Sequence, residues 1–250
     1  MTGRVLVTGG ATGVGAAIVR ALASAGFEVH FTYRSSADAA QALVDEIHAA
    51  DPNRSVTGHA LDLSDKAALE AFCDVLEDRS FFGLVHNAGQ PYDTLAATMA
   101  QDKAEAAMQV NFWALTRLAK AVLRSMIRAR AGRIVAIGSA AALQGNPGNA
   151  AYAASKGALA SYARTLAVEV GKRGVAVNVV APGFVDTAML APYAPYRGTI
   201  EKQIPAGRFA EPAEVAALVA FLLSPPAAYI TGAVLPIDGG LTAMLGVHRA

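Results

Sequence analysis

Tyr152 and Lys156 are the residues whose types and spacing point most directly to chemistry. They stand four positions apart in the alanine-rich stretch 150–160, and residues at that spacing share one face of a helix. A phenol is a weak acid, with a pKa of about 10, but a nearby ammonium favours the phenolate and brings the proton within reach of acid–base catalysis. The pair predicts a proton donor, although a tyrosine and a lysine at helical spacing more often carry no chemistry.

A hydroxyl group is predicted beside this pair. Ser139 ends the apolar run 133–139, which has the composition of a buried strand. Side chains at the carboxyl ends of parallel strands face the ligand crevice of an open α/β sheet, where a hydroxyl can hydrogen-bond a substrate oxygen. Ser139, Tyr152 and Lys156 would together supply a hydrogen-bond donor, an acid and a positive charge.

A second candidate site lies near the amino end. The stretch Thr8-Gly-Gly-Ala-Thr-Gly-Val-Gly15 follows the first apolar run and opens a helix predicted to reach about Ala25. Glycines there let the backbone turn tightly and approach a pyrophosphate, whose charge is favoured by the helix amino terminus. A plain glycine turn is the alternative, but a strand before the loop and a helix after it favour phosphate binding.

The elements that must position these residues follow from an alternation along the chain. Apolar, strand-like runs alternate with alanine-rich amphipathic runs, which predicts a doubly wound parallel α/β sheet. No repeat, linker or low-complexity tract interrupts this pattern, so we expect a single domain over residues 1–250. The runs predicted as strands are Arg4–Thr8, Phe27–Tyr33, Val56–Leu61, Gly83–Asn87, Arg133–Ser139 and Val175–Ala181.

Composition narrows the class of function. The chain is 54% hydrophobic and has a net charge of +1 with interspersed acids and bases, which leaves no electrostatic footprint for nucleic acid or an anionic membrane. The single cysteine, Cys73, cannot form an internal disulfide, and we see no secretory leader, so a cytoplasmic location is expected. No apolar run approaches the length of about 18 residues that a membrane span needs. We expect small-molecule chemistry, with no nucleic-acid, membrane or metal partner.

Four elements in this order resemble the short-chain dehydrogenase/reductase family, and the resemblance covers nearly the whole chain. They are Thr8-Gly-x-x-x-Gly13-x-Gly15, Asn111, Ser139 and Tyr152-x-x-x-Lys156. The resemblance implies a Rossmann-type, seven-stranded parallel sheet in the order 3-2-1-4-5-6-7, with Val234–Ile237 as the last strand. It also implies that Ser139 and Tyr152 bind the substrate oxygen, and that Lys156 lowers the pKa of the phenol and holds the nicotinamide ribose.

Asn111 lies in the middle of a long segment, from about Met99 to Arg130, that is predicted to be helical. An asparagine is mildly unfavourable there because its amide competes for backbone hydrogen bonds. The resemblance supplies a reason for it: Asn111 would widen the helix and hold a water molecule that links Lys156 to solvent in a proton relay.

The end of the second strand, Phe31-Thr-Tyr33-Arg34-Ser-Ser36, predicts which dinucleotide binds. NAD-selective members of such folds place an acid there for the ribose hydroxyls, whereas an arginine suits a 2′-phosphate. Tyr33 occupies the acid position, and Arg34 with Ser35 offers phosphate contacts, so NADPH is favoured. The alternative for Arg34 is a solvated strand-end charge. Thr12 stands where many NADP-dependent relatives carry an arginine or a lysine, which leaves selectivity mostly to Arg34.

The resemblance extends the cofactor contacts to other segments. Asp62 and Leu63 match an adenine-contacting pair, although Asp62 could instead cap the next helix, a role that Ser64 or Asp65 would serve better. His86-Asn87-Ala88-Gly89 resembles the family's Asn-Asn-Ala-Gly element, and we expect the substituted histidine to be structural. The residues implied to contact the dinucleotide are Gly9, Thr12, Gly13, Val14, Gly15, Tyr33, Arg34, Ser35, Asp62, Leu63, Asn87, Ala88, Gly89, Tyr152, Lys156, Pro182, Gly183, Val185 and Thr187.

Residues 186–209 are expected to form a substrate lid because their composition is rich in turn residues. Gln144 joins Ser139 and Tyr152 as a predicted substrate contact. The tail 204–240 looks most like bacterial 3-oxoacyl-acyl-carrier-protein reductases, which implies a homotetramer and a substrate tethered to an acidic acyl carrier protein. Arg130 and Arg173 would then form a basic patch near the entrance that steers this carrier. Solvated surface charge is an equal alternative for the two arginines.

These features together predict an NADPH-dependent ketoreductase that reduces a 3-oxoacyl thioester, or a related ketone, to the 3-hydroxy product. A polyketide-type ketoreductase or an NAD(P)-dependent secondary alcohol or sugar dehydrogenase is the enzymatic alternative, because the fold hosts many substrates. An NADP(H)-sensing regulator is the alternative outside catalysis. The intact set of Asn111, Ser139, Tyr152 and Lys156 argues against a sensor, which has no need of a proton relay.

Overall fold

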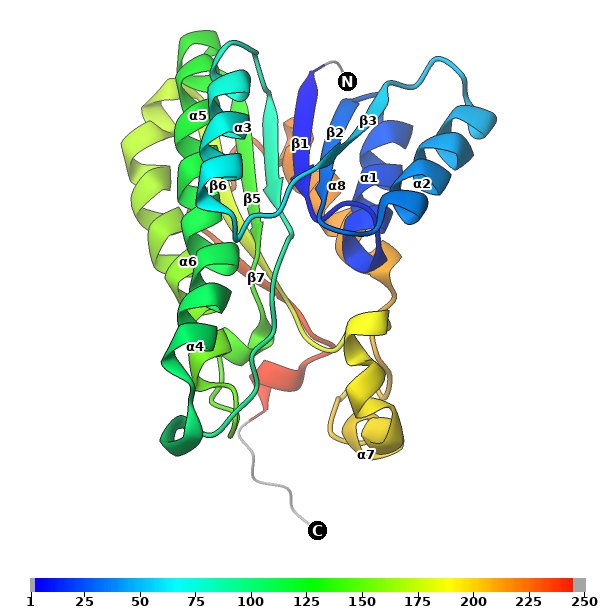
Figure 1. Ribbon diagram of the computed structural model, residues 1–250, viewed down its shortest axis with the longest axis vertical. Coiled ribbons are helices and arrows are strands. Elements are labelled where there is room, and N and C mark those ends of the chain that lie inside the picture. The colour runs from blue at the N-terminus through cyan, green and yellow to red at the C-terminus, as the bar shows by residue number, and fades with distance from the viewer. Residues whose placement is uncertain (1–2, 245–250) are drawn as a thin grey trace.

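Short apolar runs form a parallel sheet at the centre of the molecule. The computed structural model describes residues 3–244, and the predicted domain of residues 1–250 extends past them at both ends. The sheet has seven strands in the order β3-β2-β1-β4-β5-β6-β7 (Figure 1), as predicted. The strands are β1 (Arg4–Thr8), β2 (Glu28–Tyr33), β3 (Val56–Ala60), β4 (Gly83–His86), β5 (Gly132–Ile137), β6 (Val175–Pro182) and β7 (Val234–Ile237).

Helices cover both faces of the sheet (Figure 1). One face carries α1 (Gly13–Ser24), α2 (Ala37–Ala50) and α8 (Pro212–Leu223), whose buried side chains include Leu22, Leu43 and Val219. The other carries α3 (Lys66–Glu77), α5 (Ala114–Ala129) and α6 (Ala150–Val170), with Leu69, Leu118 and Leu159 in the core. Between residues 3 and 244, no helix is both long and apolar enough to cross a membrane.

The segment predicted as one helix from about Met99 to Arg130 is interrupted. α4 (Gln101–Met108) leads into a π-helical turn, Gln109–Trp113, and α5 continues the same rod. A π turn holds more residues than an α turn, and such turns occur frequently at functional sites. This one contains Asn111, so the widening implied by the family resemblance is present.

The ends of the strands bring distant segments to one edge of the sheet. Thr8 lies beside His86 in the β1–β4 register, and His86 lies beside Ala136 in the β4–β5 register. Because all these strands are parallel, the segments after Thr8, His86 and Ile137 leave the sheet at this common edge. The glycine loop, residues 87–89 and Ser139 therefore lie side by side.

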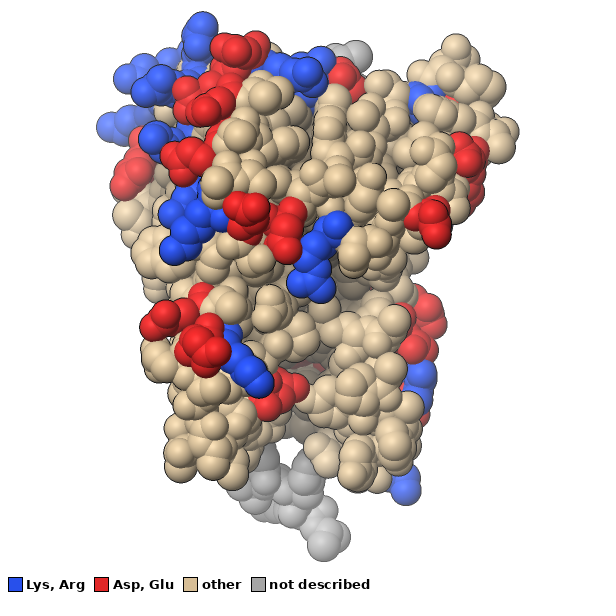
Figure 2. Space-filling model, viewed as in Figure 1, with Lys and Arg blue, Asp and Glu red and all other residues tan. Residues whose placement is uncertain are grey.

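The basic patch predicted from Arg130 and Arg173 forms, but at the opposite end of the sheet. Arg130 follows α5 and donates from Nη2 to the carbonyl of Lys172, 3.0 Å away. It precedes β5, and Arg173 precedes β6, so both lie near the amino ends of strands. Figure 2 shows Lys and Arg gathered over this end of α5. The prediction that the patch lies near the entrance is therefore wrong for a single chain.

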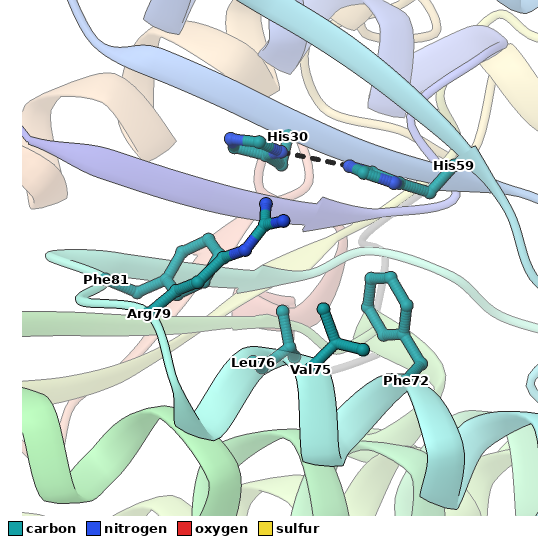
Figure 3. A pocket seen from close by; sticks show the side chains of 7 residues that line it. All are labelled: His30, His59, Phe72, Val75, Leu76, Arg79 and Phe81. Atoms are coloured by element: carbon teal, nitrogen blue, oxygen red, sulfur yellow. Dashed lines mark hydrogen bonds between the residues drawn. The ribbon is translucent and has the colours of Figure 1, made fainter.

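A small pocket of about 180 Å³ lies apart from that edge, between α3 and the strands (Figure 3). His30 and His59 come from neighbouring strands, and their Nδ1 and Nε2 atoms are 2.9 Å apart. The side chain of Arg79, from the loop after α3, extends toward this histidine pair (Figure 3). The other lining residues are Phe72, Val75, Leu76 and Phe81, and no predicted site residue takes part.

Candidate active site

The ammonium group of Lys156 lies inside the protein. The residue is 3% exposed, and its Nζ donates to the carbonyl of Ile137, 2.8 Å away at the end of β5. Its Nζ also lies 5.8 Å from the centre of the Tyr152 ring, one helical turn earlier on α6. A buried ammonium has three donors, and Ile137 is its one acceptor among residues 3–244. The remaining N–H groups are available to a ligand.

Tyr152 keeps its proton near neutrality in this environment. Burial raises the pKa of its phenol, the Ser139 hydroxyl partly opposes that rise, and the charge of Asp93 adds to it. Lys156 is not among the causes of this shift, so the expectation that its ammonium lowers the pKa of the phenol stays a prediction. Burial lowers the pKa of Lys156 itself to about 8.

Ser139 follows β5 with its hydroxyl oriented by the next residues. Its Oγ accepts the N–H of Ala141 at 3.1 Å, so its own O–H remains available as a donor. The interaction with the Tyr152 phenol places both hydroxyl groups in the same part of the site. Gln144, the third predicted substrate contact, is exposed in the loop before α6.

Asn111 is completely buried in the π turn, and its amide is held on three sides. Its Oδ1 accepts the N–H of Gln90 at 2.7 Å, and its Nδ2 donates to Gln90 O and to Ser155 Oγ at 3.1 and 2.9 Å. Both amide hydrogens are thus used by protein groups, which leaves one Oδ1 lone pair for water. The predicted water-holding role of Asn111 stays a prediction.

The glycine loop forms a backbone cradle that side chains would fill. Gly9 and Gly13 have φ values of +64° and +53°, a region that disfavours other residues. A Cβ at Gly9 would lie 3.0 Å from Ala88 Cα, and one at Gly15 would collide with the carbonyl of Gly9. The loop and the amino end of α1, where Thr12 and Val14 lie, therefore fit an approaching phosphate group.

The neighbouring loop 87–89 completes this wall. Asn87 donates from Nδ2 to the carbonyls of Thr8 and Gly9 at 3.1 and 2.9 Å, which ties the ends of β1 and β4 together. A Cβ at Gly89 would lie 3.1 Å from Lys156 Nζ. The glycine therefore keeps the approach to the buried ammonium open.

At the far end of the cradle, Arg34 and Ser35 are exposed just after β2, and Tyr33 is half-buried. The Arg34 guanidinium helps lower the pKa of Asp62, after the hydrogen bonds from Ser64. Asp65, not Asp62, caps α3, accepting the N–H groups of Ala67 and Ala68 at 2.9 and 3.0 Å. Asp62 Oδ1 accepts the N–H and the hydroxyl of Ser64 at 2.9 and 2.7 Å, and Leu63 is buried, so the adenine contact of this pair stays a prediction.

The segment after β6 lies close to the end of β7 and to the glycine loop. Pro182 ends β6, and a Cβ at Gly183 would lie 2.9 Å from the Cα of Asp238. Val185 is buried, while Thr187 approaches the glycine loop so closely that a Cβ at Gly13 would lie 3.3 Å from its Cγ2. Figure 2 shows the surface hollowed between the lobe that carries α7 (Arg197–Glu201) and the lobe that carries α4.

Comparisons with known proteins agree with this geometry. Residues 9–242 match the family model described as enoyl-(acyl carrier protein) reductase. The chain is 41% identical over 241 residues to 3-oxoacyl-(acyl-carrier-protein) reductase FabG of Escherichia coli, covering 94% of this chain and 96% of that protein. The chain belongs to the short-chain dehydrogenase/reductase family. This membership confirms the predicted oxidoreductase class.

Solved structures of the short-chain dehydrogenase/reductase fold match over almost the full length. A putative NAD(P)-dependent gluconate 5-dehydrogenase from Beutenbergia cavernae, solved with bound NADP, has a TM-score of 0.90 at 36% identity, covering 96% of this chain and 97% of that one. A variant of actinorhodin polyketide ketoreductase, solved with NADPH, has a TM-score of 0.90 at 30% identity, covering 97% and 98%.

Within this short-chain dehydrogenase/reductase site, one contact across the opening was not predictable from the sequence. Tyr193, in the helical turn Ala188–Tyr196, donates to Asp93 Oδ2 at 2.6 Å, and Asn149 donates to the other carboxylate oxygen at 2.6 Å. The hydrogen bond with Asp93 is the largest of the causes that raise the pKa of Tyr193 to about 12. An acid and a tyrosine 100 positions apart carry no spacing signal that would have revealed the pair.

The buried lysine predicts a measurable pH dependence of stability. Its pKa is about 8 in the folded chain against 10.5 for an unperturbed lysine, so between these values the unfolded chain binds the extra proton and stability rises with pH. The melting temperature of the cofactor-free wild type, minus that of Lys156→Met, should therefore rise from pH 8 toward pH 10.5. Lys120→Met, at an exposed position of α5, is the control. A difference that stays flat or falls would contradict the burial of the charge.

Proposed function

We propose that this protein is an NADPH-dependent ketoreductase that converts a 3-oxoacyl thioester, or a related ketone, to the 3-hydroxy product. The observation that carries the proposal is the buried ammonium of Lys156. It lies beside a protonated Tyr152, has unused donors, and is reached through the glycine-walled opening at Gly89. The cradle formed by Gly9, Gly15 and residues 87–89 fits a dinucleotide, and Lys156 would hold the ribose hydroxyls next to the nicotinamide.

NADPH held in this cradle would supply the hydride that the carbonyl carbon receives. Ser139 donates its O–H to the carbonyl oxygen, and Tyr152 gives the same oxygen its proton, so the C=O bond becomes CH–OH. The charge of Lys156 stabilises the phenolate that this transfer leaves on Tyr152. Asn111 anchors α6 through Ser155 and offers its remaining lone pair to a relay water that returns the proton.

The known relatives support the substrate class. Proteins about 40% identical to the chain bear the name 3-oxoacyl-(acyl-carrier-protein) reductase. The structural neighbours solved with NADP or NADPH support the cofactor. The description of the matching family model names enoyl reduction, but the hydroxyl groups of Tyr152 and Ser139 lie in the same part of the site, which suits a carbonyl oxygen better than a carbon–carbon double bond.

We also propose a substrate lid, a location, an assembly and a substrate carrier for the enzyme. Segment 186–209 acts as a substrate lid, tied across the opening by Tyr193 and Asp93. The enzyme is a cytoplasmic homotetramer that receives its substrate from an acyl carrier protein. Support for assembly comes from apolar side chains in solvent, including Val168 on α6 and Phe221 on α8, which are 83% and 43% exposed, because large exposed apolar surfaces commonly mark interfaces.

A comparison of substrates tests the proposed specificity. NADPH oxidation should be faster with a 3-oxoacyl thioester than with a 2-enoyl thioester, a simple ketone or a sugar.

Tyr152→Phe tests the proposed acid. It should lower kcat by at least about a hundredfold, because it removes the proton donor, while the Kd of NADPH stays within about twofold. Tyr162→Phe, on the same helix but directed against Phe112, is the matched control. Retained turnover in Tyr152→Phe would refute the assigned acid.

Arg34→Ala tests the choice of dinucleotide. A hydrogen-bonded charge contributes about 1.5–3 kcal/mol, so the Kd of NADPH should rise about tenfold to a hundredfold while that of NADH changes by less than about twofold. Titration of nicotinamide fluorescence measures both. Arg128→Ala, in the exposed last turn of α5, should change neither. Equal weakening of the two cofactors would show that Arg34 does not recognise the 2′-phosphate.

Tyr193→Phe tests the lid. Losing the hydrogen bond to the Asp93 carboxylate should raise the KM of the 3-oxoacyl substrate about threefold to tenfold, with the Kd of NADPH unchanged. Tyr196→Phe, in the same turn and 64% exposed, is the control. An unchanged KM in Tyr193→Phe would exclude the contact from substrate binding.

A further inference from the structure

His86 is a fully buried titratable residue that the proposed mechanism does not use. It ends β4 in the middle of the sheet, is 0% exposed, and contacts two elements of the site. Its Nδ1 lies 3.1 Å from Thr8 Oγ1, beside the glycine loop. Its Nε2 lies 3.2 Å from the main-chain oxygen of Asn111, inside the π turn. The imidazole therefore bridges the cofactor cradle and the helix that carries Asn111.

The hydrogen bonds around Thr8 determine where the ring carries its proton. Thr8 Oγ1 accepts the N–H groups of Asn87 and Ala88 at 3.1 and 3.0 Å. A hydroxyl has two lone pairs and one hydrogen, so the hydrogen of Thr8 points to His86 Nδ1, which must be an unprotonated acceptor. The hydrogen of a neutral ring is then on Nε2.

The other side of the ring requires the same tautomer. The Asn111 carbonyl can only accept, so Nε2 must donate to it. From there the connections continue through the Asn111 amide to Ser155 Oγ at 2.9 Å, and from Ser155 to the carbonyl of Tyr152 at 2.7 Å. An unbroken series of hydrogen bonds thus joins the end of β1 to the catalytic turn of α6.

We propose that His86 is a positioning residue for the reductase reaction: its neutral Nε2–H form fixes the π turn, and through it the helix that carries Tyr152, relative to the glycine loop. The proposal rests on the proposed function for its effect on turnover. Its structural part, the tautomer and its two partners, does not depend on any substrate.

The surroundings of the ring keep it neutral. Burial is the largest cause that lowers the pKa of His86 to about 3, and the charge of Lys156 on α6 adds to it. The other groups that face its nitrogens, the Thr8 hydroxyl from β1 and the backbone of Val110 and Asn111 from the π turn, are uncharged, and the two backbone groups only partly oppose the shift. A protonated ring would also direct an N–H at a Thr8 oxygen whose lone pairs are already occupied. His86 therefore serves as a fixed donor at working pH.

Two substitutions separate donation from simple packing. His86→Phe keeps a ring but loses both hydrogen bonds. The net free energy of one hydrogen bond corresponds to a change in rate of up to about tenfold. We expect kcat to fall about tenfold and the Kd of NADPH to stay within about twofold, because Thr8 keeps its bonds to Asn87 and Ala88. His86→Gln places an amide donor near the position of Nε2 and should restore kcat to within about threefold of the wild type.

The matched control is His59→Phe, in the separate pocket of Figure 3, which should leave kcat unchanged. Equal loss of kcat in His86→Phe and His86→Gln, or no loss in His86→Phe, would overturn the proposal. An equal loss of NADPH affinity would do so as well, because it would indicate a general disturbance of the sheet edge.

The tautomer is measured directly by ¹⁵N NMR of the full chain labelled in histidine, with His86 assigned by its absence in His86→Gln. A neutral ring with its proton on Nε2 from pH 5 to pH 8 is the expected result. An Nδ1–H ring, or a ring that becomes protonated in this range, would overturn the proposal. If the wild type reduces no thioester or ketone, the proposed function fails, but this measurement still decides the hydrogen-bond assignment.

Discussion

The burial of one positive charge constrains the rest of this structure. An ammonium inside a protein is costly unless polar groups surround it, and Lys156 has the carbonyl of Ile137 as its acceptor on the protein side. That carbonyl is available because β5 ends there and the chain turns away toward Ser139. The remaining donors face the glycine-walled opening at Gly89. The charge is therefore retained at a position where a ligand or water can complete its hydrogen bonds.

This arrangement separates a rigid part of the molecule from an adaptable one. The strands that end at the cradle, β1, β4 and β5, are almost completely buried, and hydrogen bonds between Thr8 and Asn87 join the ends of β1 and β4. Segment 188–203 consists largely of exposed residues, and the hydrogen bond from Tyr193 to Asp93 joins it to the other side of the opening. A common reaction can thus be kept in one part while the other adapts to different substrates.

The fold could be predicted from sequence because the alternation of apolar runs and helical segments is strong and uninterrupted, and family resemblance supplied the strand order. Tyr152, Lys156 and the glycine loop were visible because their spacing is local. The environment of each group could not be predicted from the sequence. That the Lys156 ammonium bonds a backbone carbonyl, and that burial raises the pKa of Tyr152, depends on how α6 packs against β5. Arg130 and Arg173 were misplaced for a similar reason, since their position at the amino ends of strands follows from topology and not from local pattern.

The π turn also affects which deletions the chain can tolerate. A π turn accommodates one residue more than an α turn, so deleting a single residue from Gln109–Trp113 would convert it to an ordinary α turn and leave α5 in its present orientation. The same deletion inside α5 would rotate the residues that follow it by about 100° and carry buried side chains such as Leu118 and Val122, both 0% exposed, away from the core. A deletion in the π turn would therefore change the position of Asn111 but not the burial of the sixteen-residue helix that follows it.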